Sequence, residues 1–135
     1  MKIIKPFLIA LPIFITIDYL WLGVLAKDFY FNQAGHLLKQ EFNLIAAVSF
    51  YIIYNLGLII FVIQPSLQIN CPRHAISCGA FFGLVTYSTL DLTNLAILKD
   101  WPLHLSIVDM LWGTILTAIV SAITFFTARQ LIKTN

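Results

Sequence analysis

Four apolar stretches, each separated from the next by a short polar joint, dominate the 135-residue chain. They cover residues 6–26, 42–63, 75–98 and 103–128. Each is near or above the ~20 residues that a helix needs to cross about 30 Å of hydrocarbon. Only 10% of the residues are charged, whereas a soluble domain has about a quarter. The sequence therefore predicts an all-α integral membrane protein: a single domain, residues 1–135, built as a four-transmembrane-helix bundle.

The start of the chain also has one property of a signal peptide, because Lys2 and Lys5 precede the first apolar stretch. That stretch is longer than the ~7–15 apolar residues of such peptides, and it has no A-x-A cleavage site. It also contains Asp18 and Trp21. We therefore expect the stretch to remain in the protein as its first membrane helix.

The orientation of the helices follows from the Lys and Arg residues, which are in excess on cytoplasmic flanks. Five of them lie at the two ends of the chain and in the second joint, and only three lie in the first and third joints. This distribution predicts that both termini are cytoplasmic. The formal charge of +2 is spread over these flanks without a basic stripe, so no nucleic-acid partner is expected.

Conventional catalytic and cofactor motifs are missing from the sequence, so catalytic residues and cofactors stay unassigned. Cys71 and Cys78 lie at or near the second joint, where a reducing cytoplasm disfavours a disulfide. Their spacing around His74 is not that of a common zinc site, and we predict no metal. His104, one turn before Asp109, can be interpreted in two ways. It is either a histidine at the membrane interface, or a proton relay or metal ligand beside the carboxylate.

Three of the six acidic residues, Asp18, Asp91 and Asp109, lie inside the predicted helices. An Asp near a helix centre costs about 2.5–3.5 kcal/mol on insertion scales. Counted from the outer helix ends at ~1.5 Å per residue, all three lie about 11–14 Å deep and should form one layer. Acids inside a membrane are candidates for function. The alternative is that they are protonated or hydrogen-bonded and only fix helix register.

Polar residues recur on one side of several predicted helices. Tyr87, Asp91 and Asn94 have the i, i+4, i+7 spacing of one helix face, and Gly79 and Gly83 extend that face as a G-x-x-x-G pattern that permits close helix approach. The matching stripes are Asp109, Gly113, Thr117 and Ser121 on the fourth helix and Tyr51, Tyr54 and Asn55 on the second. We expect these stripes to face inward, with the inner half of the bundle dry and sealed by small residues.

A short pattern, D-x-L-W followed by Gly, occurs at residues 18–23 and again at 109–113. One interpretation is an internal repeat, in which two antiparallel helices each place an acid and an indole, Trp21 or Trp112, at the same level. The other is coincidence in a short, Leu-rich chain.

Four segments together carry a family resemblance: D-Y-L-W-L-G at 18–23, T-Y-S-T-L-D-L-T-N-L-A at 86–96, W-P-L at 101–103 and V-D-M-L-W-G at 108–113. With them the chain resembles a bacterial family of four-helix membrane proteins known as a domain of unknown function. The resemblance implies a four-helix fold in the bacterial inner membrane. It implies no particular activity.

Our leading hypothesis is a polar site inside the membrane that binds or transports a small cationic or amphipathic ligand with proton exchange. Its candidate residues are Asp18, Trp21, Tyr87, Asp91, Asn94, Asp109 and Trp112. One alternative is a membrane enzyme that uses two of the carboxylates as general acid and base on a lipid. Another is a structural or accessory subunit of a membrane complex. The partners expected are membrane lipids and either a second copy of the chain or another membrane protein.

Overall fold

The structure, a computed structural model, describes residues 2–39 and 41–134, and these residues form helices and no strand. Four segments are long and apolar enough to span a membrane: Ile4–Leu25, Leu44–Gln68, Pro72–Ile97 and Leu103–Lys133. Large apolar side chains cover the outside of the bundle, with Ile45 81% and Phe61 71% exposed. Extensive exposed apolar surface marks contact with a membrane. The predicted all-α membrane bundle is therefore confirmed.

Six α-helices and three short irregular turns make up these spans and their joints. Their order is α1 (Ile4–Leu20), a π-helical turn (Trp21–Leu25), α2 (Lys27–Ala34), a 3₁₀ turn (Gly35–Leu37), α3 (Leu44–Leu58), a second π-helical turn (Ile59–Ile63), α4 (Gln64–Gln68), α5 (Pro72–Ile97) and α6 (Leu103–Lys133). α3 begins at a capped end, because the Asn43 side chain accepts a hydrogen bond from the backbone N–H of Ala46.

The observed spans differ from the predicted ones by up to five residues at their ends. The second span continues to Gln68 instead of stopping at residue 63: a π-helical turn leads directly into α4, where Pro65 lies in the first turn, a position that tolerates a residue without an N–H. The fourth continues to Lys133 because a helix can extend beyond its apolar stretch into the polar interface. The first joint, expected as a short polar connection, contains α2.

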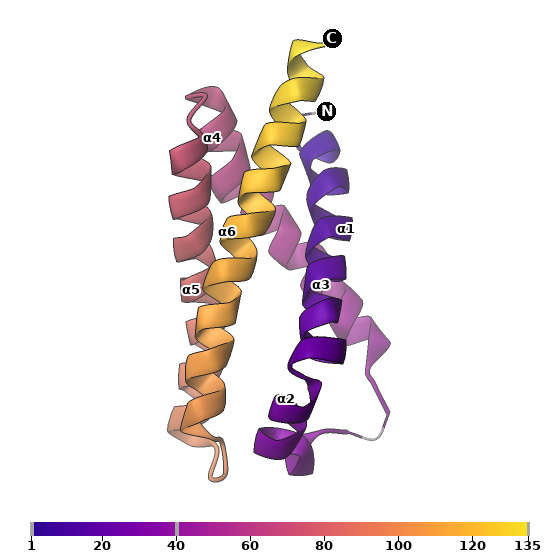
Figure 1. The fold of residues 1–135 in the computed structure, drawn as a ribbon, viewed down its shortest axis with the longest axis vertical. Coiled ribbons are helices and arrows are strands. Elements are labelled where there is room, and N and C mark those ends of the chain that lie inside the picture. The colour runs from indigo at the N-terminus through magenta and orange to yellow at the C-terminus, as the bar shows by residue number, and fades with distance from the viewer. Residues whose placement is uncertain (1, 40, 135) are drawn as a thin grey trace.

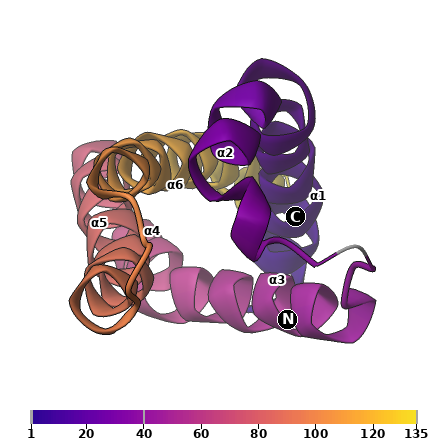
Figure 2. The ribbon, with the colours of Figure 1, turned by 90° about the horizontal axis from the view of Figure 1, so that it is seen from below.

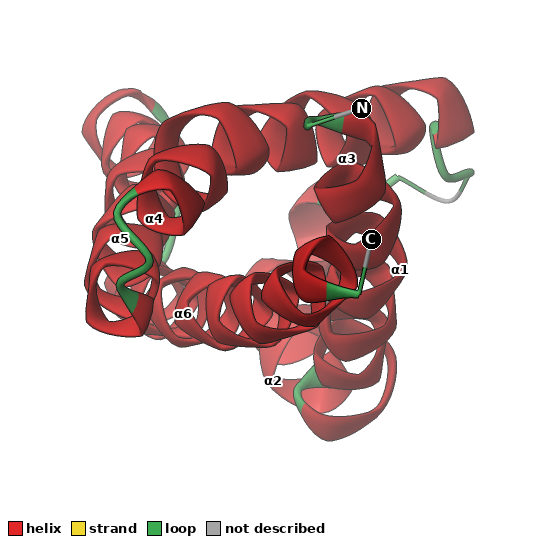
Figure 3. Ribbon diagram, turned by 90° about the horizontal axis from the view of Figure 1, so that it is seen from above, coloured by secondary structure: helices red, strands yellow, loops and turns green. Residues whose placement is uncertain are grey.

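The four spans run in alternating directions, so both termini lie at one end of the bundle (Figure 1). We call this the terminal end. The opposite end, which carries α2 and the joint between α5 and α6, is the loop end. Viewed along the bundle, α1, α3, α5 and α6 follow one another around a ring (Figures 2 and 3), and α3 crosses the others obliquely.

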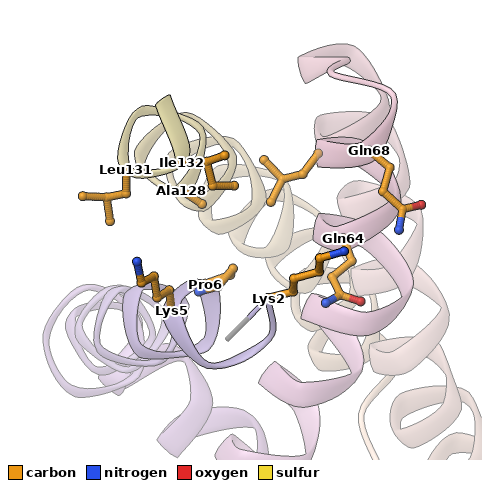
Figure 4. Close-up of a pocket in the computed structure, with 9 residues that line it drawn as sticks. Lys2, Lys5, Pro6, Gln64, Gln68, Ala128, Leu131 and Ile132 are labelled. Atoms are coloured by element: carbon orange, nitrogen blue, oxygen red, sulfur yellow. The ribbon is translucent and has the colours of Figure 1, made fainter. Parts of the chain in front are cut away.

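The middle of the bundle is packed with buried apolar side chains. Phe14, Leu58, Leu116 and Val120 each have an exposed fraction of 0%. A cavity lies on either side of this core. The one at the terminal end has a volume of about 480 Å³ (Figure 4) and is lined by Lys2, Lys5, Pro6, Gln64, Leu67, Gln68, Ala128, Leu131 and Ile132. That half of the bundle is therefore less completely sealed than we expected.

Candidate functional site

The cavity at the loop end has a volume of about 450 Å³ and receives side chains from all four spans and α2. The three intramembrane aspartates, Asp18, Asp91 and Asp109, all line it. No Lys, Arg or His is among its lining residues. The cavity therefore contains three acidic groups and no basic side chain to balance them.

Asp18, near the end of α1, is held by hydrogen bonds from two other helices. Tyr51 of α3 donates its hydroxyl proton to Oδ2 at 2.9 Å, and Trp112 of α6 donates Nε1–H to Oδ1 at 3.1 Å. The side chain is 4% exposed. Because each oxygen has its own donor, Asp18 joins α1, α3 and α6 and leaves little capacity for a ligand.

Asp109, on α6, is reached by a residue from outside the membrane spans. Tyr30 of α2 donates its hydroxyl proton to Oδ1 at 2.7 Å, and its oxygen lies 3.3 Å from Nε1 of Trp21, which donates to it. Burial raises the pKa of the Tyr30 phenol, and the negative charge of Asp109 raises it further. Tyr30 therefore remains a proton donor to the carboxylate, and α2 closes over the cavity.

The two D-x-L-W segments meet in the structure. The indole rings of Trp21 and Trp112 stack with centroids 4.4 Å apart and planes within 8°. Each indole is linked by hydrogen bonds to the aspartate of the other segment. Trp112 donates to Asp18 directly, and Trp21 donates to the Tyr30 hydroxyl, which donates to Asp109. This reciprocal arrangement supports the interpretation of the pattern as a repeat.

Asp91, on α5, is the exception among the three acids. It is 1% exposed, and neither of its carboxylate oxygens has a hydrogen-bond partner among the described residues. Its neighbour is the carboxyl group of Asp109, with which it can form a hydrogen bond only when one of the two carries a proton. Its backbone carbonyl is fixed by Ser106, whose hydroxyl lies 3.2 Å away. The backbone of Asp91 is therefore held by α6, while its carboxyl group has no donor among the described residues.

Aromatic rings form much of the remaining wall. Tyr54 and Tyr87 meet edge to face with centroids 6.1 Å apart, and the Tyr54 hydroxyl lies 2.6 Å from the Thr117 hydroxyl. Tyr87 packs over Gly113 so closely that a Cβ there would overlap its ring. The cavity is thus lined by carboxyl groups and by aromatic side chains.

The structure brings together most of the residues predicted for the site. Asp18, Tyr87, Asp91 and Asp109 line the cavity. Trp112 and Trp21 do not line it, but they donate hydrogen bonds to two lining residues, Asp18 and Tyr30. Asn94 does not line it.

Sequence reasoning missed Tyr30, although the aromatic run at 29–31 is unusually apolar for a solvated joint. It also assigned Trp101 no role in the site. Trp101 lines the cavity and donates Nε1–H to the Ser106 hydroxyl at 2.8 Å. Ser106 in turn bonds the backbone carbonyl of Asp91.

A metal site receives no support from the arrangement of ligand-type side chains. Within residues 2–39 and 41–134, no three His, Cys, Asp or Glu side chains are grouped to hold a metal ion. His104 is exposed and lies outside the cavity lining. Among the described residues, His104 therefore has no contact through which it could relay protons to the cavity.

Of the comparisons with known proteins, only the one with family models finds a match. Neither the curated proteins nor the solved structures contain a match to this chain. One family model matches nearly the whole length, residues 3–126. Its description agrees with the four membrane spans and gives no activity. The chain therefore belongs to the family described as predicted membrane protein (DUF2177).

Proposed function

We propose that the protein binds a small organic cation in the loop-end cavity and exchanges it for a proton. The observation that carries this proposal is Asp91, a fully buried carboxyl group without a donor that faces a second carboxyl group. An unsatisfied buried polar group costs free energy. A bound cation can supply a counter-charge where the donor is missing.

Charge favours a cation over other ligands. As a general scale, two unit negative charges at a separation of about 4 Å repel each other by about 4 kcal/mol at an effective dielectric constant near 20. A single proton shared by Asp91 and Asp109 removes that repulsion when the cavity is empty. A cation removes it as well, so cation and proton compete for the same pair of oxygens. This competition couples binding to proton release.

The aromatic wall suits an organic cation more than a hydrated metal ion. Tyr and Trp faces attract ammonium groups through their electron-rich π systems. Tyr51, Tyr54, Tyr87 and Trp101 all line the cavity. The volume of about 450 Å³ falls within the range of small-molecule sites. An alkylammonium with an apolar body fits both parts of the surface.

The proposed orientation places the loop end, and with it the cavity, toward the outside of a bacterial inner membrane. It rests on the excess of Lys and Arg around the termini and the second joint. Carriage across the membrane also requires a path through the apolar core, where Phe14 and Leu116 now lie. Binding and proton exchange do not require that path, so they are tested first.

The test uses benzyltrimethylammonium, a permanent cation with an aromatic ring, and the purified protein in liposomes. Wild-type protein should bind it, and Asp91→Asn should weaken binding at least about 30-fold, since a desolvated charge partner contributes about 2–5 kcal/mol. Asp100→Asn is the matched control, because Asp100 lies at the same end but outside the cavity lining. Equal affinity in wild type and Asp91→Asn, or equal loss in the control, would refute the proposal.

A further inference from the structure

Three side chains at the terminal end form a hydrogen-bonded series separate from the loop-end cavity. Ser66 of α4 donates its hydroxyl proton to the carbonyl of Val62 at 2.6 Å. Its oxygen lies 2.8 Å from Nδ1 of His74, and Nε2 of the same ring lies 3.5 Å from Sγ of Cys78. The order of contacts is serine, histidine, cysteine.

These contacts select one form of the neutral imidazole. Because the Ser66 proton points to Val62, the serine oxygen can only accept from His74, so Nδ1 carries the hydrogen. Nε2 is then unprotonated and accepts from the Cys78 thiol. A nucleophile next to a base that a third group orients is the arrangement found in enzymes that use covalent catalysis.

The fold builds this series from a tight turn and one helix face. Asn70 has a positive φ of 52°, and the N–H of Cys71 bonds the Ser66 carbonyl at 3.1 Å. The turn folds α4 back onto the first turns of α5 and buries Ser66 fully. His74 and Cys78 are four residues apart on α5 and therefore neighbours on its surface.

We propose that Cys78 is a nucleophilic thiol that accepts acyl groups from thioesters, with His74 as its base and Ser66 as the positioning residue. The Cys78 proton moves to Nε2 of His74 while Sγ bonds to the acyl carbon. The bond between that carbon and the donor sulfur breaks, and the leaving thiolate takes the proton from His74. One thioester replaces another, so the exchange needs no oxidant or further reactant.

The membrane position of Cys78 favours an acyl donor over other electrophiles. Cys78 lies six residues after Pro72, the first residue of α5, and thus about 9 Å along the helix. It is half-buried and packs against the apolar core. We expect a thioester to reach this depth from the interface, with its acyl chain in the hydrocarbon.

The test incubates the protein in phosphatidylcholine liposomes with octanoyl-coenzyme A and follows acylation of each cysteine by peptide mass spectrometry. Cys71 is an internal reference, since it is also half-buried but its thiol is not hydrogen-bonded to His74, which contacts Cys78 instead. We expect Cys78 to acylate about 10²-fold faster than Cys71, the lower end of general-base catalysis. His74→Phe should reduce Cys78 to the rate of Cys71.

Two serine variants separate positioning from a general effect on the fold. The hydroxyl of Ser77, like that of Ser66, bonds the carbonyl four residues earlier, but it is not hydrogen-bonded to His74. Ser66→Ala should slow Cys78 acylation at least tenfold and leave Cys71 unchanged, whereas Ser77→Ala should change neither. Equal rates at the two cysteines, or a Cys78 rate insensitive to both His74→Phe and Ser66→Ala, would overturn the proposal.

Discussion

Replacing Gly83 by alanine should push α5 and α6 apart and separate the two carboxyl groups that face each other across them. A Cβ on Gly83 would overlap the backbone carbonyl of Gly113 and lie 2.7 Å from the Thr117 hydroxyl oxygen. A favourable contact between such atoms needs roughly 3.5 Å. The carbonyl belongs to the helix backbone and cannot rotate away, so the helices themselves must move.

The magnitude follows from two opposing terms. Adding a carbon to a well-packed interior costs about 1–3 kcal/mol, and the backbone obstacle places Gly83→Ala in the upper part of that range. Alanine returns about 1 kcal/mol as the better helix former. We therefore expect the free energy of unfolding to fall by about 1–2 kcal/mol. Gly23→Ala is the control, because its Cβ meets only the Tyr19 ring at 3.5 Å, an ordinary contact.

The assay is unfolding of each variant by SDS in mixed micelles, followed by circular dichroism. Gly83→Ala should be less stable than wild type, and Gly23→Ala should be equally stable or more stable by up to about 1 kcal/mol. The affinity for benzyltrimethylammonium should also fall in Gly83→Ala alone. If Gly83→Ala proves as stable as wild type, or if Gly23→Ala loses as much stability, the packing argument is wrong.

Two further variants test the hydrogen bonds around the cavity. Trp112→Phe removes one of the two donors to the buried Asp18 carboxylate and should destabilise the protein by about 1.5–3 kcal/mol in the same assay; a change below 0.5 kcal/mol would show that this bond is not formed. Tyr30→Phe removes the donor to Asp109 and should cost a similar amount, while Tyr19→Phe, at an exposed residue with no such bond, should cost almost nothing. Equal losses in the two tyrosine variants would contradict the role given to α2.

The number, type and approximate limits of the spans could be predicted because they depend on local quantities. A run of ~20 apolar residues specifies a membrane helix without reference to its neighbours. The common level of Asp18, Asp91 and Asp109 also followed from counting along helices, and the structure places all three on one cavity. The Gly79 and Gly83 face was read correctly as a close-packing surface, and α6 occupies it. It is therefore not free for a partner protein.

What the sequence left open depends on which helices become neighbours. In each D-x-L-W segment the tryptophan is linked to the aspartate of the other segment. These hydrogen bonds require α1 to lie against α6, which no local pattern specifies. Tyr30 was missed because a joint was assumed to be solvated, and α2 instead brings it to Asp109. Asn94 is three residues from Asp91 and thus rotated by about 60° around the helix. That rotation is enough to take it out of the lining.

The central claim is that Asp91 and Asp109 share a proton that an organic cation displaces. Titration calorimetry with benzyltrimethylammonium in two buffers of different ionisation enthalpy gives the number of protons released for each cation bound. The ligand has no acidic proton, so every released proton comes from the protein. Wild type should release about one proton near neutral pH, and Asp100→Asn should behave the same. Binding without proton release, or release that persists unchanged in Asp91→Asn, would contradict the account.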